Sequence, residues 1–357
     1  MLKALTFICC LCFSFLSMAS GLAIDTFISE LESQQDSVQG AAVAIIIDGK
    51  IVYKKSFGYK DPEKTIPINN DTLFALASTS KPIISTAISL LVSQGKMDFN
   101  DKVKLTFLKS SMSMANFLSH TTGYKVTGNS QIESGNNKEK LINFIRQRNQ
   151  ECKPSKCYKY SNLMYSFIDD ALKIKGYTIK KAIELLNEKI GTTDITLLPI
   201  SKESNFANQY SRNGKLLSFP SNYQKSVPAA AGVFASINSM AEFLKLAMES
   251  RPEILNDQVL SKIFTPIVEN KDIFLWNIDL PFENNRIKSY YGLGWRILFV
   301  DNKQESRLIF HSGFINGATT FMGFVPDKKA GIIVLVNQTS PFAMNQGFKF
   351  WAKLLNM

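Results

Sequence analysis

The order of apolar and polar positions divides the chain into strand-rich ends and a helical middle. Residues 24–35 (IDTFISELESQQ) place apolar side chains at helical spacing, and residues 41–60 contain two strand-like runs. The two runs meet at Asp48-Gly49, a dipeptide typical of a two-residue hairpin turn. We therefore expect the N-terminal part of the chain to contribute a short amphipathic helix and a β-hairpin.

The middle of the chain, to about residue 280, mixes helical patterns such as those at 181–190 and 239–249 with polar loops. Four apolar runs with strand character then follow, at 290–300, 306–313, 319–326 and 330–338. This order predicts an α+β fold. One antiparallel sheet is built from the N- and C-terminal segments and flanked by helices, and a mostly helical region is inserted into it.

The closing helix has Phe348, Trp351 and Leu355 on one face. Such a face could touch a membrane, but packing on the sheet is the better interpretation. We find no internal repeat and no low-complexity linker, so residues 24–357 are expected to form one domain.

An apolar run at 71–91 holds two residues that a core helix does not need, Ser78 and, three positions later, Lys81. Burying an unpaired ammonium group is costly. Pro82 is tolerated only in the first turn of a helix, so the helix is expected to begin near Ser78. One turn of helix would then bring the Lys81 amine to the Ser78 hydroxyl. This placement is typical of a serine nucleophile with a neighbouring base.

Composition and the first residues indicate an exported globular protein. The chain has 357 residues, 45% of them hydrophobic and 20% charged, with a formal net charge of +11. The basic residues are scattered, which argues against nucleic acid as a partner and allows an anionic cell-wall polymer or a membrane surface. Residues 1–23 have a basic start, a short apolar run and small residues, the pattern of a signal peptide cleaved near Ala19 or Ala23. No later run is long enough for a membrane span.

Two cysteines, Cys152 and Cys157, remain after that cleavage. In an oxidising compartment they are candidates for a disulfide, with two free thiols as the alternative. Only two histidines exist, His120 and His311, and neither lies near the cysteines in sequence. We therefore predict no metal site and no cofactor.

Three short motifs stand in a fixed order: Ser78-Thr79-Ser80-Lys81, Tyr160-Ser161-Asn162 and His311-Ser312-Gly313. With these motifs the sequence resembles the serine β-lactamases and penicillin-recognising DD-peptidases, and is most similar to their class C β-lactamase-like branch. Flanking segments such as PAAAGVFAS and YYGLGW match as well. The resemblance covers nearly all of the chain after the signal peptide.

The resemblance implies roles for individual residues. Ser78 is the nucleophile, and Lys81 and Tyr160 share the proton transfer, with either as the base. The substrate is bound by Asn162 and by the third motif, His311, Ser312 and Gly313. The backbone N–H groups of Ser78 and Phe314 form the oxyanion hole. His120 receives no chemical role, because its family position looks structural.

His311 departs from the pattern, because most class C β-lactamases carry a lysine there. With a histidine at this position, the sequence resembles certain DD-peptidases and esterases of the group. A DD-carboxypeptidase acting on D-amino-acid peptides is therefore the preferred interpretation. A β-lactamase and an esterase stay open as alternatives, as does a non-catalytic penicillin or peptidoglycan sensor. The substrate is accordingly a D-amino-acid peptide, a β-lactam or an ester.

Overall fold

The computed structural model describes residues 23–198, 205–271, 286–301, 303 and 306–355. The predicted signal peptide lies outside the described residues except for Ala23. Helical structure over 23–32 precedes a short 3-10 turn, η1 (Gln35–Ser37). Within the described part of the chain, no helix is both long and apolar enough to cross a membrane.

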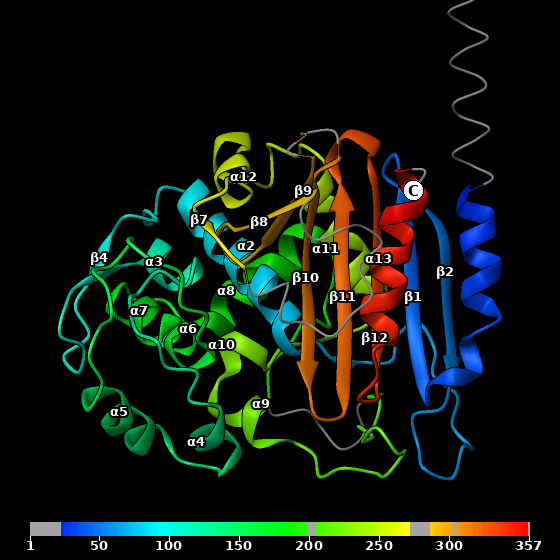
Figure 1. Ribbon diagram of the computed structural model, residues 1–357, viewed down its shortest axis with the longest axis horizontal. Coiled ribbons are helices and arrows are strands. Elements are labelled where there is room, and N and C mark those ends of the chain that lie inside the picture. Colours follow the sequence, from blue (N-terminus) through cyan, green and yellow to red (C-terminus); the bar gives the residue numbers. More distant parts are fainter. Residues whose placement is uncertain (1–22, 199–204, 272–285, 302, 304–305, 356–357) are drawn as a thin grey trace, which may run out of the picture.

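The centre of the molecule is an antiparallel sheet with the order β2-β1-β12-β11-β10-β9-β8-β7 (Figure 1). Its strands are β1 (Gly40–Ile47), β2 (Lys50–Gly58), β7 (Val268–Glu269), β8 (Ile287–Tyr291), β9 (Arg296–Val300), β10 (Leu308–Ile315), β11 (Ala318–Val325) and β12 (Ala330–Val336). The N-terminal β1 pairs with the C-terminal β12, so the two ends of the chain build one sheet. This confirms the predicted fold class.

The hairpin between β1 and β2 forms where the sequence predicts it. Ile47 pairs with Lys50 across the turn, and Asp48 and Gly49 have positive φ values of 46° and 72°. Such a turn needs two left-handed residues, which aspartate and glycine tolerate.

Alternate residues of the strands bury their side chains in two separate cores. On β1, Val43 and Ile45 face one core while Ala44 and Ile46 face the other, as the two-residue period of a strand requires. The first core is covered by the helical residues 23–32 and by α13 (Phe342–Leu354). Phe348 and Trp351 of α13 are fully buried against the sheet, so this helix packs as predicted.

The second core lies under α2 (Ser80–Ser93), α8 (Ile179–Ile190) and α11 (Ile237–Met248). Further helices form a group beside the sheet (Figure 1): α3 (Met114–Leu118), α4 (Asn129–Glu133), α5 (Lys138–Arg146), α6 (Asn162–Ser166), α7 (Ile168–Ile174), α9 (Asn222–Ser226), α10 (Pro228–Ala231) and α12 (Asp257–Ile263). The short pairs β3 (Phe74–Ala75) with β6 (Phe234–Ala235) and β4 (Lys102–Val103) with β5 (Met112–Ser113) tie this region together. The last 3-10 turn, η6 (Pro326–Lys328), links β11 to β12.

Candidate active site

Ser78 lies in a strained turn at the start of the buried helix α2. A 3-10 turn, η2 (Ala77–Thr79), precedes the helix proper, so α2 begins at Ser80, two residues later than predicted. Ala77 has a φ of 48°, which an L-residue adopts at an energetic cost that the surrounding structure must offset. Because the backbone of Ala77 is held in this conformation, the side chain of the next residue, Ser78, leaves the chain in a fixed direction.

The sheet supplies the restraint on that turn. The carbonyl oxygen of Leu76 accepts hydrogen bonds from the Thr79 N–H at 3.0 Å, the Thr79 hydroxyl at 2.6 Å and the Thr320 hydroxyl of β11 at 2.9 Å. Gly313 of β10 lies against the same carbonyl, because a Cβ there would be 2.4 Å from the Leu76 oxygen. The third motif therefore needs glycine at this position so that β10 can approach the turn that carries Ser78.

Lys81 points to Ser78 as the sequence spacing predicts. Its Nζ lies 3.0 Å from Ser78 Oγ, 2.8 Å from Asn162 Oδ1 and 2.9 Å from the Ala230 carbonyl oxygen. The side chain is fully buried. Burial, and then the positive charge of Arg296, hold the pKa of Lys81 well below its usual value.

A neutral Lys81 amine fits these three contacts. The Asn162 amide oxygen and the Ala230 carbonyl oxygen can only accept, so they take the two N–H groups of the amine. The lone pair is then directed at Ser78 Oγ, where it can receive the hydroxyl proton.

Tyr160 reaches the same serine from another element. Its hydroxyl lies 3.1 Å from Ser78 Oγ, and Lys81 Nζ lies 4.9 Å from its ring centroid. The His120 ring packs 4.2 Å away, centroid to centroid, and its Nδ1 accepts a 3.3 Å hydrogen bond from the Ser161 N–H. His120 thus holds the segment that carries Tyr160. This supporting position agrees with the structural role expected for His120 from the sequence.

Asn162 begins helix α6, directly after the cap residue Ser161. Besides accepting the bond from Lys81, its side chain hydrogen bonds to the Tyr223 hydroxyl. It also lines the cavity in front of Ser78. Asn162 therefore combines two tasks: it orients the lysine, and it faces the space expected for the substrate amide.

His311 does not face that cavity, in contrast to the substrate contact expected from the sequence. The ring is buried, its Nδ1 lies 2.8 Å from the Ser312 carbonyl oxygen, and its Nε2 lies 2.9 Å from the Tyr291 hydroxyl. Because a carbonyl only accepts, Nδ1 carries the proton, and in the neutral ring Nε2 accepts from Tyr291. Burial, Arg296 and Lys81 hold the pKa of His311 well below its usual value.

A cation that does line the cavity beside the third motif is Arg296, which the sequence analysis missed. It lies on β9 and pairs with Phe310 of β10, directly beside the third motif. Its guanidinium carbon lies 5.3 Å from the Tyr160 ring centroid and 5.6 Å from that of Tyr291, within cation–π range. The sequence signal that could have identified Arg296 is a charged residue inside the apolar run 290–300, since arginine is rarely buried unless its charge is paired.

The backbone of β10 also turns a donor toward the cavity. Ile315 and Ala318 close a two-residue turn, so they form a hydrogen-bonded pair. The next pair along the ladder, Phe314 with Thr319, is therefore the non-bonded kind, and the Phe314 N–H points away from β11. The ladder with β9 stops at Phe310, so this N–H faces the cavity that Phe314 lines.

The cavity itself has a volume of about 780 Å³. Ser78, Tyr160, Asn162, Ser312, Gly313 and Phe314 all line it. Lys81 lies behind the wall but contacts Ser78 and Asn162, so of the residues predicted to act on the substrate only His311 is turned away. Among the described residues, no cluster of three histidine, cysteine or acidic side chains could hold a metal ion.

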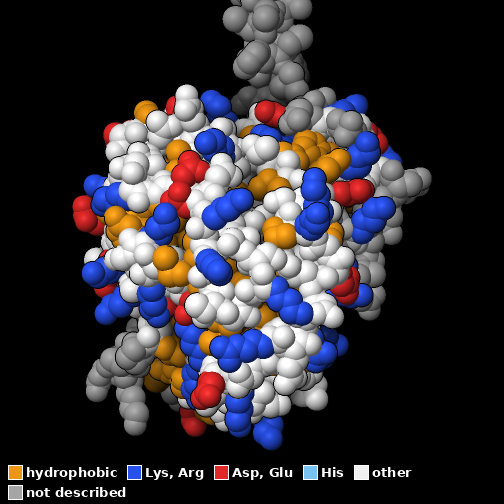
Figure 2. All heavy atoms as spheres, turned by 90° about the vertical axis from the view of Figure 1, so that its left-hand side faces the viewer, with side chains coloured by type: hydrophobic (Ala, Val, Ile, Leu, Met, Phe, Trp, Pro, Cys, Tyr) orange, Lys and Arg blue, Asp and Glu red, His pale blue; other side chains and the backbone are white. Residues whose placement is uncertain are grey.

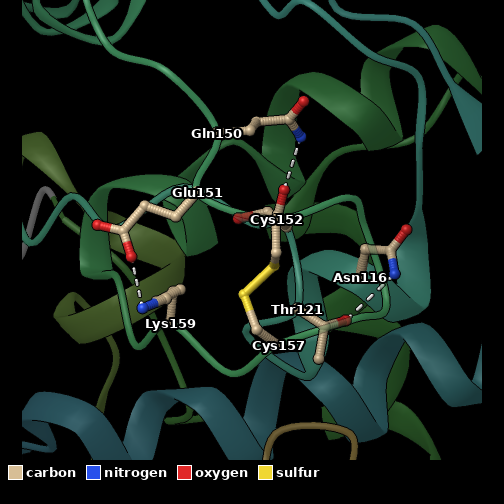
Figure 3. Close-up of a disulfide and its surroundings, with 8 residues drawn as sticks. Asn116, Thr121, Gln150, Glu151, Cys152, Cys157 and Lys159 are labelled. Carbon is tan, nitrogen blue, oxygen red and sulfur yellow. Dashed lines mark hydrogen bonds and ion pairs between the residues drawn. A yellow bond between two sulfur atoms is a disulfide. The ribbon is translucent and has the colours of Figure 1, made fainter.

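Cys152 and Cys157 form a disulfide close to this site (Figure 3). The loop that it closes and the residues on either side are docked on residues 120–123. The Ser155 N–H within the loop donates to the Thr121 carbonyl at 2.9 Å, and outside it the Glu151 N–H donates to the Gly123 carbonyl at 2.9 Å and the Lys159 N–H to the His120 carbonyl at 2.8 Å. Lys159 also forms an ion pair with Glu151 at 2.6 Å. The disulfide therefore stiffens the segment that leads directly into Tyr160.

Comparisons with known proteins agree with this architecture. A structure of the octameric penicillin-binding protein homologue from Pyrococcus abyssi superposes with a TM-score of 0.75 and 25% identity, covering 93% of this chain and 76% of that one. Protein flp from Staphylococcus aureus (strain MW2) is 23% identical over 89% of this chain and 63% of its own length. The chain thus spans less than two thirds of that relative.

A second relative is similar in length to this chain. A protein named Beta-lactamase from Providencia stuartii is 23% identical, covering 89% of this chain and 87% of its own. The model of the family described as Beta-lactamase matches residues 24–355. With nearly the whole described structure inside that match, the chain belongs to the Beta-lactamase family.

Proposed function

We propose that the protein is a serine hydrolase that forms an acyl-enzyme on Ser78. The observation that carries this proposal is that Ser78 Oγ lies 3.0 Å from Lys81 Nζ and 3.1 Å from the Tyr160 hydroxyl at the edge of a cavity. A serine hydroxyl becomes nucleophilic when a base in hydrogen-bond contact takes its proton. Two such groups touch this one.

The first half of the reaction follows from these contacts. Ser78 Oγ attacks the substrate carbonyl carbon while its proton passes to the Lys81–Tyr160 pair, which titrates as a unit. The backbone N–H groups of Ser78 and Phe314 stabilise the oxygen that becomes negative. The tetrahedral intermediate then collapses to an ester on Ser78, and the leaving group receives the proton from the same pair.

The second half returns the enzyme to its starting state. Water attacks the ester carbonyl, the Lys81–Tyr160 pair takes a proton from the water, and Ser78 leaves as the protonated hydroxyl. The described residues present no carboxylate in the cavity wall for activating this water, so the same pair serves both halves.

Arg296 supports a substrate with a free carboxylate on the leaving side. A guanidinium group keeps its charge and pairs with a carboxylate through two hydrogen bonds. We therefore propose a DD-carboxypeptidase-type activity on D-amino-acid peptides. The Providencia relative named Beta-lactamase keeps β-lactam hydrolysis as the second candidate.

Export, to a periplasmic or secreted location, belongs to the same proposal. The disulfide between Cys152 and Cys157 is typical of proteins in oxidising compartments. Basic side chains are spread over the face that covers the helical region (Figure 2), compatible with an anionic cell-wall polymer as a neighbour.

Labelling with a fluorescent penicillin tests the proposal. We expect a covalent adduct that mass spectrometry locates on Ser78 and that Ser78→Ala abolishes. Ser93→Ala, which removes a serine three residues before another lysine, should label normally. A protein that binds penicillin without forming an adduct would be a sensor instead of an enzyme.

The lifetime of the adduct separates the two candidate activities. We expect a stable penicilloyl-enzyme with slow turnover, and faster hydrolysis of D-Ala-D-Ala peptides or small activated esters. Release within about a second, close to a typical enzyme turnover of roughly 10 per second, would identify a β-lactamase.

A further inference from the structure

Positive charge surrounds the cavity beyond Arg296. Its described wall also includes Lys125, Lys159 and Arg212, and none of the described wall residues is acidic. Lys159 is balanced by its ion pair with Glu151. Lys125 is also attracted by the Glu151 carboxylate, whose pKa both lysines lower. Lys125 and Arg212 are exposed, and Arg212 is the wall cation for which no acidic neighbour is described.

Arg212 is held at one end of β10. The loop that carries it packs on the β10–β11 turn, because a Cβ on Gly317 would lie 2.7 Å from Gln209 Cβ and 2.8 Å from Leu217 Cδ1. The Arg212 carbonyl accepts a 3.1 Å hydrogen bond from the Gln338 side chain. The backbone position of Arg212 is thus fixed by the sheet.

Arg296 lies at the other end of the segment of β10 that runs from Phe310 to Ile315. It pairs with Phe310, whereas the loop of Arg212 covers the turn after Ile315. At about 3.3 Å per residue, the strand from Phe310 to Ile315 spans roughly 17 Å. Gly313, which contacts the nucleophile turn, lies between the two ends, so Ser78 faces the middle of the segment.

This order assigns the two arginines to different parts of a substrate. If Arg296 binds a carboxylate on the leaving side, then the part of the substrate beyond Ser78, the acyl part, extends toward Arg212. Lys125 reaches the cavity wall from the segment beside Asn162, since the backbone carbonyl of its neighbour Val126 accepts a hydrogen bond from the Ser161 hydroxyl.

We propose that the acyl part of the substrate carries a second carboxylate, bound by Arg212 together with Lys125, so that the preferred substrate has a negative charge on each side of the scissile bond. This inference rests on the proposed acyl-enzyme at Ser78. It narrows the substrate class from D-amino-acid peptides in general to peptides with an acidic acyl part.

Benzylpenicillin and its derivative with an α-carboxylate on the side chain provide a matched pair, because they differ only by that carboxylate group on the acyl part. The rate constant for acylation of Ser78 is measured for both by mass spectrometry. We expect the dicarboxylate to react about tenfold faster or more, as a charge-assisted hydrogen bond allows. The advantage should shrink as salt is added, since both cations are exposed.

Variants locate the effect. Arg212→Gln and Lys125→Gln should each reduce the preference, which is the ratio of the two acylation rates, and together remove it, while thermal unfolding reports that each variant is folded. Arg212→Lys should keep part of the preference. Arg146→Gln, an exposed arginine on α5 outside the cavity wall, is the control and should keep all of it.

The outcomes separate the two proposals. Equal acylation rates for both penicillins, or a preference that survives in the double variant, would overturn the proposal that Arg212 and Lys125 bind a second carboxylate. The proposed acyl-enzyme on Ser78 would be unaffected. The absence of any Ser78 adduct from either compound would overturn both.

Discussion

Replacing Gly313 by alanine tests whether contact between β10 and the nucleophile turn sets the reactivity of Ser78. The added Cβ would lie 2.4 Å from the Leu76 carbonyl oxygen, about 1 Å closer than the 3.4 Å at which ordinary contact begins. The Cβ would also lie 2.2 Å from Thr320 Oγ1, a side-chain atom, but the Leu76 oxygen is backbone, so rotating side chains does not relieve the clash with it. The strand or the turn must move by about 1 Å.

That displacement is expected to affect rate more than stability. The Leu76 carbonyl anchors Thr79 and Thr320, so its movement carries Ser78 away from Lys81. A misplacement of about 1 Å in a catalytic group costs on the order of 100-fold in rate. Overpacking costs about 1–3 kcal/mol of unfolding free energy, which lowers the melting temperature by several degrees in a protein of this size.

Gly323→Ala on β11 is the matched control. Its Cβ would lie 2.6 Å from Phe310 Cβ and 3.1 Å from the Ile309 carbonyl oxygen, so it overpacks the same sheet away from the nucleophile turn. The assay is the acylation rate with penicillin, measured beside thermal unfolding. If Gly313→Ala keeps its rate within about threefold of wild type, or loses no more than Gly323→Ala, then this contact does not position Ser78.

Three further predictions concern the groups around the serine. Lys81→Ala and Tyr160→Phe should each remove most activity and the double variant little more, since groups that act as a unit are not additive; acylation rates that multiply would contradict a shared relay. Arg296→Gln removes a charge that lowers the pKa of Lys81, so that pKa should rise and the acid limb of kcat/KM for a neutral ester should move to higher pH; an unmoved limb would argue against the coupling. Joint replacement of Cys152 and Cys157 by serine should lower the unfolding free energy by about 2 kcal/mol on the chain-entropy model. The acylation rate should fall by a larger factor than this loss of stability explains. Unchanged thermal unfolding and an unchanged acylation rate would show that the disulfide does not stiffen the segment before Tyr160.

Local signals in the sequence were sufficient for much of the fold and for the core of the site. The hairpin at Asp48-Gly49 follows from the backbone conformations that these two residues tolerate. The contact between Ser78 and Lys81 follows from helical spacing, because residues three apart in a helical turn lie on one face. Strand-rich ends around a helical middle likewise predict a sheet built from both termini.

Tertiary structure alone decided that Arg296 lines the cavity while the His311 ring is turned away from it. The sequence places His311 in a motif and Arg296 in an apolar run, and neither pattern states where the side chain points. Strand register does: Arg296 pairs with Phe310 and lines the cavity, whereas the ring of His311 turns to Tyr291 on β8. Pairings between distant strands are not encoded in the spacing of nearby residues, and the side of a strand on which a residue lies reverses with a register shift of one. The chain therefore encodes the contact between Ser78 and Lys81 locally, while the place of the Arg296 charge in the cavity wall is set only once the sheet has formed.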